Sequence, residues 1–265
     1  MILIEGIKEF EIESAVAVGY FDGMHPGHKL IIGKTVKAKD RGFVPAVLTF
    51  DFSKKRPGGK IGKDLFPKQE KYREMQALGI EICVECDFTM IENMTAEYFL
   101  HEVLIGRMRC KEIFCGEDFR FGHNRSTDAE MLKNMAKPEG VVVEVIPSLY
   151  LEDKIISTTG IKQFVEEGKV DEAARILGRN YGIYATITDI QNEKILGFLD
   201  GGLTLPKAGR YLSSIGREAS PDKVAKIVVE DNQKNPKATV EISGDKTPKI
   251  NEKIFISLFR YLGEL

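Results

Sequence analysis

Short apolar runs alternate with longer helical patterns through the first 150 residues, and this alternation limits the fold more than any other feature of the chain. The runs are rich in Val, Ile and Phe, and apolar residues recur at helical spacing between them. This order favours a mostly parallel sheet with right-handed crossovers and helices on both faces. Strands are predicted at 15–19, 44–50, 80–86, 111–115 and 141–146, and helices at 27–40, 67–78, 95–107 and 128–136.

The pattern changes in the last third of the chain. Residues 157–178 indicate two short helices separated at Gly168, and Gly178 ends the second, as glycine often does at a helix C-terminus. From Tyr181 onward apolar and polar residues alternate with period two, which is typical of a small antiparallel sheet or barrel. We therefore predict an α/β domain over residues 1–180 and a small antiparallel β domain over residues 181–265.

Composition excludes several broad classes of function. The formal net charge of the 265-residue chain is −2, so no global field attracts nucleic acid or an anionic membrane, and any anion site must be local. No window approaches the ~20 apolar residues of a membrane-spanning helix, and Glu5 interrupts the apolar N-terminus within four residues. We expect a soluble cytoplasmic protein with no nucleic-acid or membrane partner; the sequence does not define its oligomeric state.

Four cysteines raise the question of a metal site. Cys83 and Cys86 lie in one strand-like run, where side chains three positions apart point to opposite faces and do not chelate one ion. Cys115 ends another such run, and Cys110 lies just before it. The sequence predicts buried thiols in a reducing compartment and no metal ligands among them.

The stretch GYFDGMHPGHKLI, residues 19–31, holds two of the four histidines. It lies where a predicted strand gives way to a helix, and ligands of open parallel sheets bind beyond the carboxyl ends of the strands. Pro26 suits a first helical position, so the free N–H groups that follow favour a phosphate. His25 and His28 can donate hydrogen bonds to phosphate oxygens and stabilise charge that develops there.

The chemistry that fits these parts is attack on a nucleotide α-phosphate with pyrophosphate as the leaving group. It requires placement and charge neutralisation but no covalent nucleophile. Two other interpretations fit the same residues. One is a capping histidine beside a surface histidine at a tight turn; the other is a metal site, although no third ligand follows at a recognisable spacing.

Four stretches resemble the prokaryotic FAD synthetases of the nucleotidyltransferase superfamily, in matching order over roughly residues 12–185. GYFDGMHPGHKLI is similar to the first signature with its His-x-Gly-His element, and TFD at 49–51 to the end of the second strand. CGEDFRFGHNRSTDAEML at 115–132 resembles the flavin-site motif. ISTTGIKQFVEEGKVDEAARILGRNYGI at 156–183 resembles the ISSTxIR motif and the helices that lead into a second domain.

The resemblance implies a Rossmann-like nucleotidyltransferase domain that joins ATP and FMN into FAD with the help of Mg²⁺. Carried over by position, the catalytic residues are His25, His28 and Lys162. The ATP-binding residues are Gly19, Phe21, Asp22, Gly23, Ser157, Thr158 and Thr159, and the flavin-binding residues are Phe50, Asp51, Asp118, Phe119 and Phe121. Without the resemblance, EDFRF fits the aromatic end of a core strand equally well, and STT fits a helix cap.

Two motifs depart from the family pattern. TTGIKQ stands where the family has STRIR, so Gly160 replaces the first arginine and Lys162 the second. Lysine keeps the charge but lacks the planar fork of arginine. We expect transition-state stabilisation to be weaker, by roughly one to two orders of magnitude if a charged hydrogen bond worth ~1.5–3 kcal/mol is lost. TFDFSKKRP replaces TFDPHP, and its Lys54, Lys55 and Arg56 either meet a phosphate or form a solvated loop.

The C-terminal region resembles a reduced riboflavin kinase barrel. The family's kinase motif reads like GRTLGFPTAN; this chain retains Leu196, Gly197 and Phe198 but not the Pro-Thr-Ala-Asn that follows. We therefore expect a monofunctional FMN adenylyltransferase without kinase activity. The alternatives are a flavin- or nucleotide-binding regulatory paralogue with little turnover, and an enzyme for a different nucleotidyl acceptor, against which the retained GEDFRFG argues.

Overall fold

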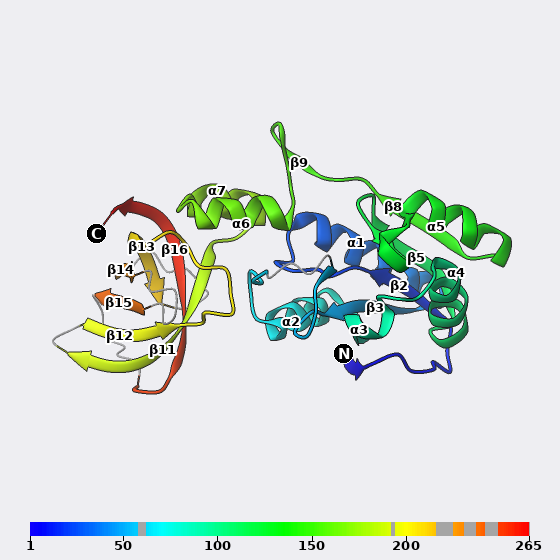
Figure 1. The fold of residues 1–265 in the computed structure, drawn as a ribbon, viewed down its shortest axis with the longest axis horizontal. Coiled ribbons are helices and arrows are strands. Elements are labelled where there is room, and N and C mark those ends of the chain that lie inside the picture. The colour runs from blue at the N-terminus through cyan, green and yellow to red at the C-terminus, as the bar shows by residue number, and fades with distance from the viewer. Residues whose placement is uncertain (58–61, 192–193, 216–224, 231–236, 242–248, 265) are drawn as a thin grey trace. The chain divides into compact units, whose positions relative to one another are not determined.

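The chain folds into two compact units, shown in the computed structural model of Figure 1. The structure describes residues 1–57, 62–191, 194–215, 225–230, 237–241 and 249–264. The first unit comprises Met1–Gly62 and Lys68–Ile155, and the second comprises Lys63–Pro67 and Ile156–Leu265.

A six-stranded sheet in which every pairing is parallel forms the centre of the first unit. Its order is β1 (Ile2–Glu5), β4 (Ile82–Asp87), β3 (Val44–Asp51), β2 (Ser14–Val18), β5 (Cys110–Gly116) and β8 (Val142–Ile146). From β2 the chain first builds outward through β3 and β4, then returns to the other side of β2 to build β5 and β8. The strand order therefore reverses between β2 and β5, which is the place where open α/β sheets bind ligands.

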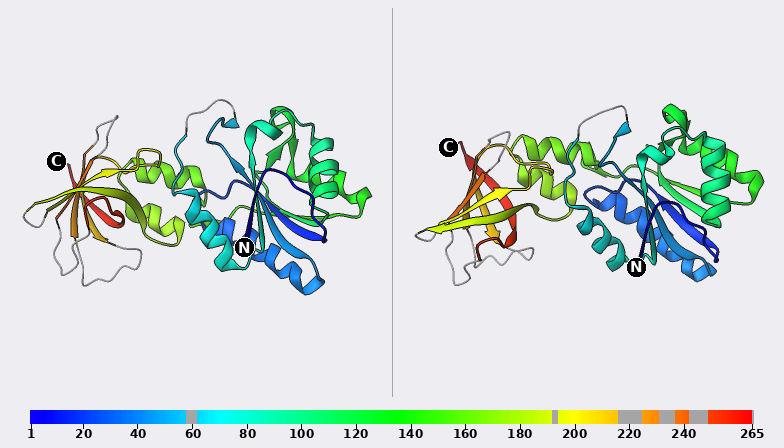
Figure 2. Two further views of the ribbon diagram at one scale, coloured as in Figure 1. Left: turned by 90° about the horizontal axis from the view of Figure 1, so that it is seen from below. Right: turned by 60° about the horizontal axis from the view of Figure 1, so that its bottom comes forward.

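Helices lie on both faces of this sheet (Figure 2). They are α1 (Pro26–Lys37), α2 (Lys68–Leu78), α3 (Phe88–Ile91), α4 (Ala96–Tyr98) and α5 (Ala129–Ala136). A π-helical segment, η3 (Phe99–Arg107), continues α4, and the short helical turns are η1 (Ala38–Arg41), η4 (His123–Arg125) and η5 (Lys137–Glu139).

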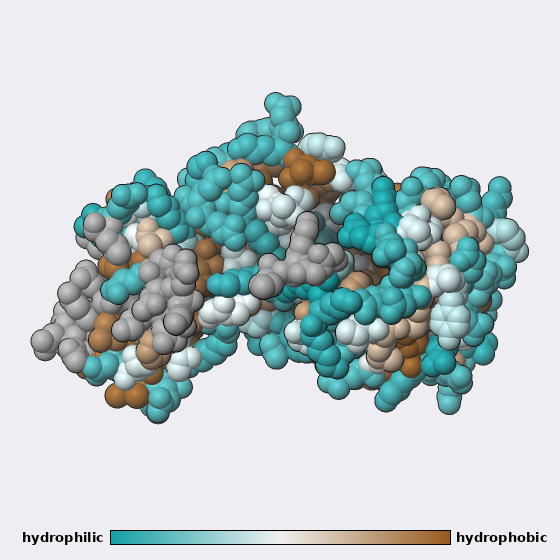
Figure 3. Space-filling model, in the orientation of Figure 1, coloured by the Kyte–Doolittle hydropathy of each residue, from teal (hydrophilic) through white to brown (hydrophobic). Residues whose placement is uncertain are grey.

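The core of the first unit has two apolar layers, one on each face of the sheet. Alternate residues of β2 contribute to each: Ala15 and Ala17 to the layer that contains Ile32 of α1, and Val16 and Val18 to the layer that contains Leu104 of η3. Burial on both faces explains why the strands read as continuous apolar runs. Hydrophilic residues dominate the face drawn in Figure 3.

The predicted strands and helices of the first unit are confirmed, with boundaries that differ by a few residues. β1 is not among the predicted strands because its apolar run is short and ends at Glu5; Ile2 and Leu3 are exposed on this edge strand. Two short hairpins were also missed: β6 (Arg120–Phe121) with β7 (Thr127–Asp128), and β9 (Tyr150–Leu151) with β10 (Lys154–Ile155).

The second unit contains two helices and a closed antiparallel barrel, as the period-two pattern predicted. The helices are α6 (Thr158–Glu166) and α7 (Val170–Leu177). Gly168 separates them and Gly178 ends the second, both with positive φ. The barrel order is β11 (Tyr181–Gln191), β12 (Lys194–Leu199), β15 (Lys237–Glu241), β14 (Ala225–Glu230), β13 (Gly209–Ile215) and β16 (Lys253–Gly263).

The two units do not divide at residue 180, where the sequence-based domain boundary was drawn, but between Ile155 and Ile156. Residue 180 marks the start of the barrel strands. Helices α6 and α7 group with the barrel because α7 packs against β11 and β16.

A short segment, Lys63–Pro67, also belongs to the second unit, although its neighbours in the sequence belong to the first. The backbone N–H of Thr204 donates to the Asp64 carbonyl at 2.7 Å, and the ring of Phe66 lies 5.4 Å from that of Tyr181. These are long-range contacts, so no local pattern predicts them. Among the described residues, no helix has the length and apolar character to cross a membrane.

Candidate functional site

Two of the sequence motifs meet at the reversal of strand order. The turn of residues 19–25 follows β2, and residues 117–121 follow β5, which pairs with β2. A Cβ built on Gly116 lies 3.8 Å from Cδ1 of Ile31, so helix α1 closes against the end of β5. The structure thus brings the His-x-Gly-His element and the GEDFRFG motif to one edge of the sheet.

The turn after β2 packs closely against the buried ring of Phe21. A Cβ on Gly19 would lie 2.9 Å from Cζ of Phe21, so only glycine permits this approach. Phe21 itself has φ 57° and is 2% exposed, and Met24 has φ 45°. A positive φ costs a non-glycine residue about 1–3 kcal/mol, and this conformation is kept only where the surrounding structure imposes it. Asp22 is also buried here.

His25 is the N-cap of α1, and Pro26 occupies the first helical position as predicted. The backbone N–H of His28 donates to Nδ1 of His25 at 3.4 Å. Nδ1 must then be unprotonated, which leaves the ring proton on Nε2. A Cβ on Gly27 would lie 3.2 Å from the His25 ring, so the missing side chain lets the imidazole fold over the helix N-terminus.

The two imidazoles stack, with ring centroids 3.6 Å apart and ring planes 22° from parallel. Burial lowers the pKa of His25 to about 4. Burial also lowers the pKa of His28 well below 6.5, and the charges of His25 and Lys71 lower it further. Both rings are therefore neutral at pH 7. Nδ1 of His28 is buried and has no hydrogen-bond partner in the described part of the chain.

This arrangement can bind a phosphate through hydrogen bonds from backbone and imidazole N–H groups. The N–H groups of the first turn of α1 and the ring N–H groups of two neutral imidazoles lie at one helix N-terminus, where the helix dipole favours an anion. The capping histidine of the alternative interpretation is present, but the second histidine is stacked on it and half-buried rather than free on the surface.

The predicted flavin-binding residues divide into core and surface groups. Phe50 and Phe121 are buried, and Phe121 packs on Phe99 with ring centroids 5.5 Å apart. Phe119 is half-buried and stacks on Phe121 at 5.4 Å, whereas Asp118 is exposed. Phe121 is therefore a core aromatic residue, as the alternative interpretation of EDFRF held, whereas Phe119 and Asp118 are accessible to a ligand.

Asp51 lies at the carboxyl end of β3. Its Oδ1 accepts a hydrogen bond from the Ser53 N–H at 2.8 Å, and Nζ of Lys68 lies 3.6 Å from its other oxygen. Burial alone would raise the pKa of Asp51, but the bonds from Ser53 and Lys68 outweigh it and hold the pKa below the usual range. The carboxylate is therefore ionised.

The remaining predicted residues belong to the second unit. Ser157 is the N-cap of α6, and its hydroxyl accepts a hydrogen bond from the Gly160 N–H at 3.2 Å. Thr158 and Thr159 form the first turn of that helix, and Lys162 follows in the next. The helix-cap interpretation of STT is therefore correct for Ser157.

The basic residues after β3 are engaged by neighbours. Lys54 pairs with Asp87 at 2.5 Å and Lys55 with Glu92 at 2.6 Å. The guanidinium of Arg56 lies 5.7 Å from the centre of the Tyr20 ring and 5.6 Å from that of Phe52. The charges of Lys54 and Lys55 are thus balanced by carboxylates.

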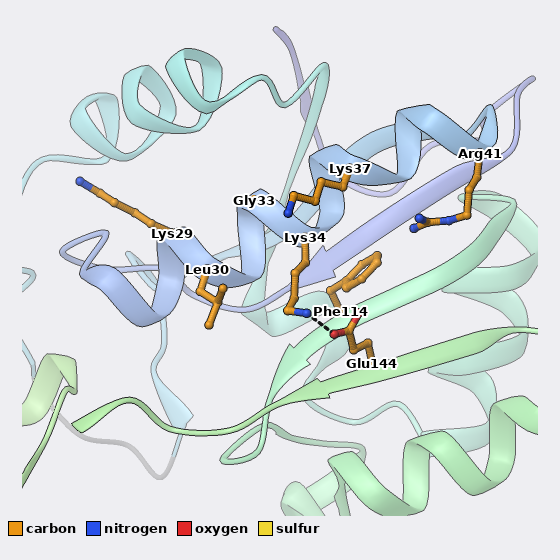
Figure 4. A pocket seen from close by; sticks show the side chains of 8 residues that line it. All are labelled: Lys29, Leu30, Gly33, Lys34, Lys37, Arg41, Phe114 and Glu144. Atoms are coloured by element: carbon orange, nitrogen blue, oxygen red, sulfur yellow. Dashed lines mark hydrogen bonds and ion pairs between the residues drawn. The ribbon is translucent and has the colours of Figure 1, made fainter.

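A separate hollow of about 390 Å³ lies along α1 (Figure 4). Three of the four cations that line it are paired: Lys34 with Glu144 at 2.5 Å, Arg41 with Glu112 at 2.5 Å and Lys29 with Glu74 at 3.1 Å. These carboxylates offset much of its positive charge, and it holds none of the predicted site residues. It is therefore a weaker candidate than the turn of residues 19–25 together with His28, which we call the histidine turn.

The four cysteines are free and buried, which confirms the prediction of buried thiols. Burial raises their pKa, to about 11 for Cys86 and about 12 for Cys83, Cys110 and Cys115. Among the residues that the structure describes, no three side chains of His, Cys, Asp or Glu are grouped so that they could hold a metal ion.

Lys71 of α2 belongs to this site although it lies in none of the sequence motifs. It is 7% exposed, and its Nζ donates to the carbonyl oxygen of Tyr20 at 3.3 Å. The available signal was its position four residues before Met75, which is fully buried, because residues four apart share one face of a helix.

Comparison with known proteins agrees with this geometry. The crystal structure "Macrolide-efflux Protein from Streptococcus pneumoniae" shares the fold, with a TM-score of 0.85 and 24% identity over all of this chain and 92% of that one. The bifunctional riboflavin kinase/FMN adenylyltransferase of Buchnera aphidicola subsp. Schizaphis graminum is 32% identical over 217 residues, 77% of this chain and 67% of that protein. The FAD synthetase of Listeria monocytogenes is 26% identical over 209 residues, 77% of this chain and 82% of that protein. The family model for FAD synthetase matches residues 7–160, more than half of the chain, so this chain belongs to the FAD synthetase family.

Proposed function

We propose that the chain is an FMN adenylyltransferase, which joins ATP and FMN into FAD and pyrophosphate. The observation that carries the proposal is the pair of stacked, neutral histidines at the N-terminus of α1, beside the reversal of strand order. In this reaction a phosphate oxygen of FMN forms a bond to the α-phosphorus of ATP. The bond from that phosphorus to the bridging oxygen breaks, and pyrophosphate leaves with the electron pair.

Such a transfer needs positioning and charge stabilisation more than proton transfer, since the attacking phosphate of FMN is already ionised at pH 7. We assign His25 and His28 to the phosphates, as donors to oxygens on which charge develops. The turn that positions both histidines is formed by Gly19, Phe21, Asp22 and Gly23. Mg²⁺ would be bound together with ATP.

The flavin assignment uses the accessible residues of the GEDFRFG motif. Phe119 offers a half-buried ring on which a flat aromatic ligand can stack, with Asp118 beside it. We assign Phe121 and Phe50 to the support of this surface from the core, and Asp51 to a charged position at the end of β3.

In the second unit we propose that Thr158, Thr159 and Lys162, in the first turns of α6, serve ATP. Two arginines of the family motif are replaced here, one by Gly160 and one by Lys162. Helix α6 therefore lacks the planar guanidinium that binds a phosphate with two hydrogen bonds, and we expect slower turnover than with the arginines.

Riboflavin kinase activity is proposed to be absent. The retained Gly197 has a packing reason, because a Cβ there would lie 2.9 Å from the carbonyl oxygen of Thr186 on the neighbouring strand. Its retention therefore does not require a kinase. The four free thiols fit a reducing cytoplasm as the place of the reaction.

The test is chromatographic detection of FAD after incubation with ATP and Mg²⁺, with FMN in one sample and riboflavin in the other. We expect FAD from FMN alone. FAD from both would contradict the loss of the kinase. No FAD in either sample, with tight flavin binding by fluorescence, would replace the proposal with a regulatory binding protein.

His28→Ala is expected to abolish FAD formation without changing the far-UV circular dichroism spectrum. His101→Ala is the matched control, because His101 lies on η3 with its side chain 43% exposed. Equal turnover of His28→Ala and wild type would refute the assigned mechanism.

A further inference from the structure

A lysine outside every motif is buried beneath the histidine turn. Lys71 of α2 is 7% exposed, and lysine is among the residues least often found inside proteins. Its Nζ donates to the carbonyl oxygen of Tyr20 at 3.3 Å and to Oγ1 of Thr49 at 3.1 Å. The hydroxyl of Thr49 in turn donates to the same Tyr20 carbonyl at 3.1 Å.

The carbonyl that Lys71 and Thr49 hold belongs to the most constrained part of the turn. It precedes Phe21, whose φ of 57° aims its ring at Gly19. That ring makes a T-shaped contact with the imidazole of His28, with ring centroids 5.3 Å apart. Fixing the Tyr20 carbonyl thus fixes Phe21, and Phe21 supports the imidazole of His28.

Lys71 also contributes charge to this region. Its cation adds to burial and to His25 in lowering the pKa of His28. The groups around His28 are His25 on its own helix and Lys71 from α2, with Asp22 buried in the turn. Lys29 of α1 and Glu74 of α2 pair with each other at 3.1 Å. Protonation of His28 would also place an N–H on the buried Nδ1, which lacks an acceptor among the described residues.

We propose that Lys71 is a positioning residue of the adenylyl-transfer site, which anchors the Tyr20 carbonyl and, through Phe21, keeps the His28 imidazole in place. Lys71 does not touch the substrate; it acts through the turn and through its charge. The inference deepens the proposed function and rests on it for its kinetic consequence. Its structural consequence, the state of His28, can be measured without turnover.

The test compares Lys71→Met, which keeps the length of the side chain without charge or donors, with Lys71→Arg, which keeps the charge. Lys39→Met is the control, because Lys39 forms a surface pair with Glu81 at 2.8 Å. The pKa of His28 is read from imidazole NMR signals, assigned by their loss in His28→Asn. Turnover of FMN to FAD is measured from pH 5 to 8.

We expect Lys71→Met to raise the pKa of His28, to move the acid limb of the pH–kcat profile to higher pH, and to lower kcat at pH 7 by roughly tenfold to a hundredfold. Lys71→Arg should restore the pKa and most of the turnover, and Lys39→Met should match wild type. A folded Lys71→Met protein with an unchanged His28 pKa and an unchanged pH profile would overturn the inference. Wild-type protein that makes no FAD would overturn the proposed function instead and leave the NMR comparison valid.

Thr49→Val tests the same anchor with the charge of Lys71 intact, and it serves if Lys71→Met does not fold. Here kcat should fall while the pKa of His28 stays near the wild-type value. Wild-type turnover in Thr49→Val would refute the role of the Tyr20 carbonyl.

Discussion

Protonation of His25 should destabilise the first unit, because the N-cap of α1 depends on the unprotonated Nδ1 of this residue. Burial lowers its pKa from 6.5 to about 4 in the folded chain. Between these values the unfolded chain carries a proton that the folded chain lacks, so unfolding takes up a proton. The free energy of unfolding therefore rises with pH across this window and is lost as pH falls from 6.5 toward 4. At about 1.4 kcal/mol per pKa unit, the loss from His25 amounts to about 3 kcal/mol.

His25→Asn isolates this effect. Asparagine keeps an oxygen that accepts the N-cap hydrogen bond but does not titrate. In wild type, His25 adds about 1.4 kcal/mol per pH unit to the slope of unfolding free energy between pH 4.5 and 6. We expect His25→Asn to lack that part of the slope. His28 titrates in both proteins, so its contribution largely cancels in the difference.

The assay is urea unfolding followed by far-UV circular dichroism at half-unit steps of pH, because the chain contains no tryptophan for fluorescence. His101→Asn, at an exposed histidine, controls for the loss of any one imidazole. Parallel plots of unfolding free energy against pH for wild type and His25→Asn would refute the reasoning, since a neutral, buried N-cap histidine cannot be replaced without a change in proton uptake.

Two further predictions concern glycines. Gly19→Ala should displace the Phe21 ring, lower the free energy of unfolding by about 1–3 kcal/mol and slow FAD formation. The control is Gly33→Ala, which has open space around it and should be neutral or stabilising by up to about 1 kcal/mol. Urea titration and turnover measure both variants, and wild-type values for Gly19→Ala would contradict the packing argument. Gly160→Arg combined with Lys162→Arg should raise kcat by roughly tenfold or more. An unchanged kcat would mean that the missing fork does not limit the reaction.

The sequence predicted the elements whose pattern is local. Strands buried on both faces read as continuous apolar runs, helices with one apolar face show helical periodicity, and Gly168 and Gly178 follow directly on such helical patterns. β1 was not predicted because its apolar run is only a few residues long and ends at Glu5. The segment Lys63–Pro67 escaped because its partners, such as Thr204, lie far along the chain.

The site divides in the same way. His25 and His28 were predicted because the strand end, the proline and both histidines stand in one short stretch, so the cap geometry follows from spacing. Burial of both rings was not predicted, because it depends on Phe21 folding back over Gly19. Lys71 was not predicted because helix α2 begins at Lys68, 43 residues after His25, and the charge of Lys71 reaches the turn only through the packed fold.

The electrostatics of this turn explain why a buried lysine suits it. A nucleotide triphosphate is a polyanion, yet both imidazoles are neutral at pH 7, and nearby Lys54 and Lys55 are paired with carboxylates. The N-terminus of α1 and the cation of Lys71 are two sources of positive potential at this turn. The neutral imidazole of His25 keeps its single N–H on Nε2, because its Nδ1 accepts the cap hydrogen bond. Under the proposed function, the imidazole donors assigned to the phosphate are uncharged, while part of the charge that would attract it lies on Lys71, to which we assign no contact with the substrate.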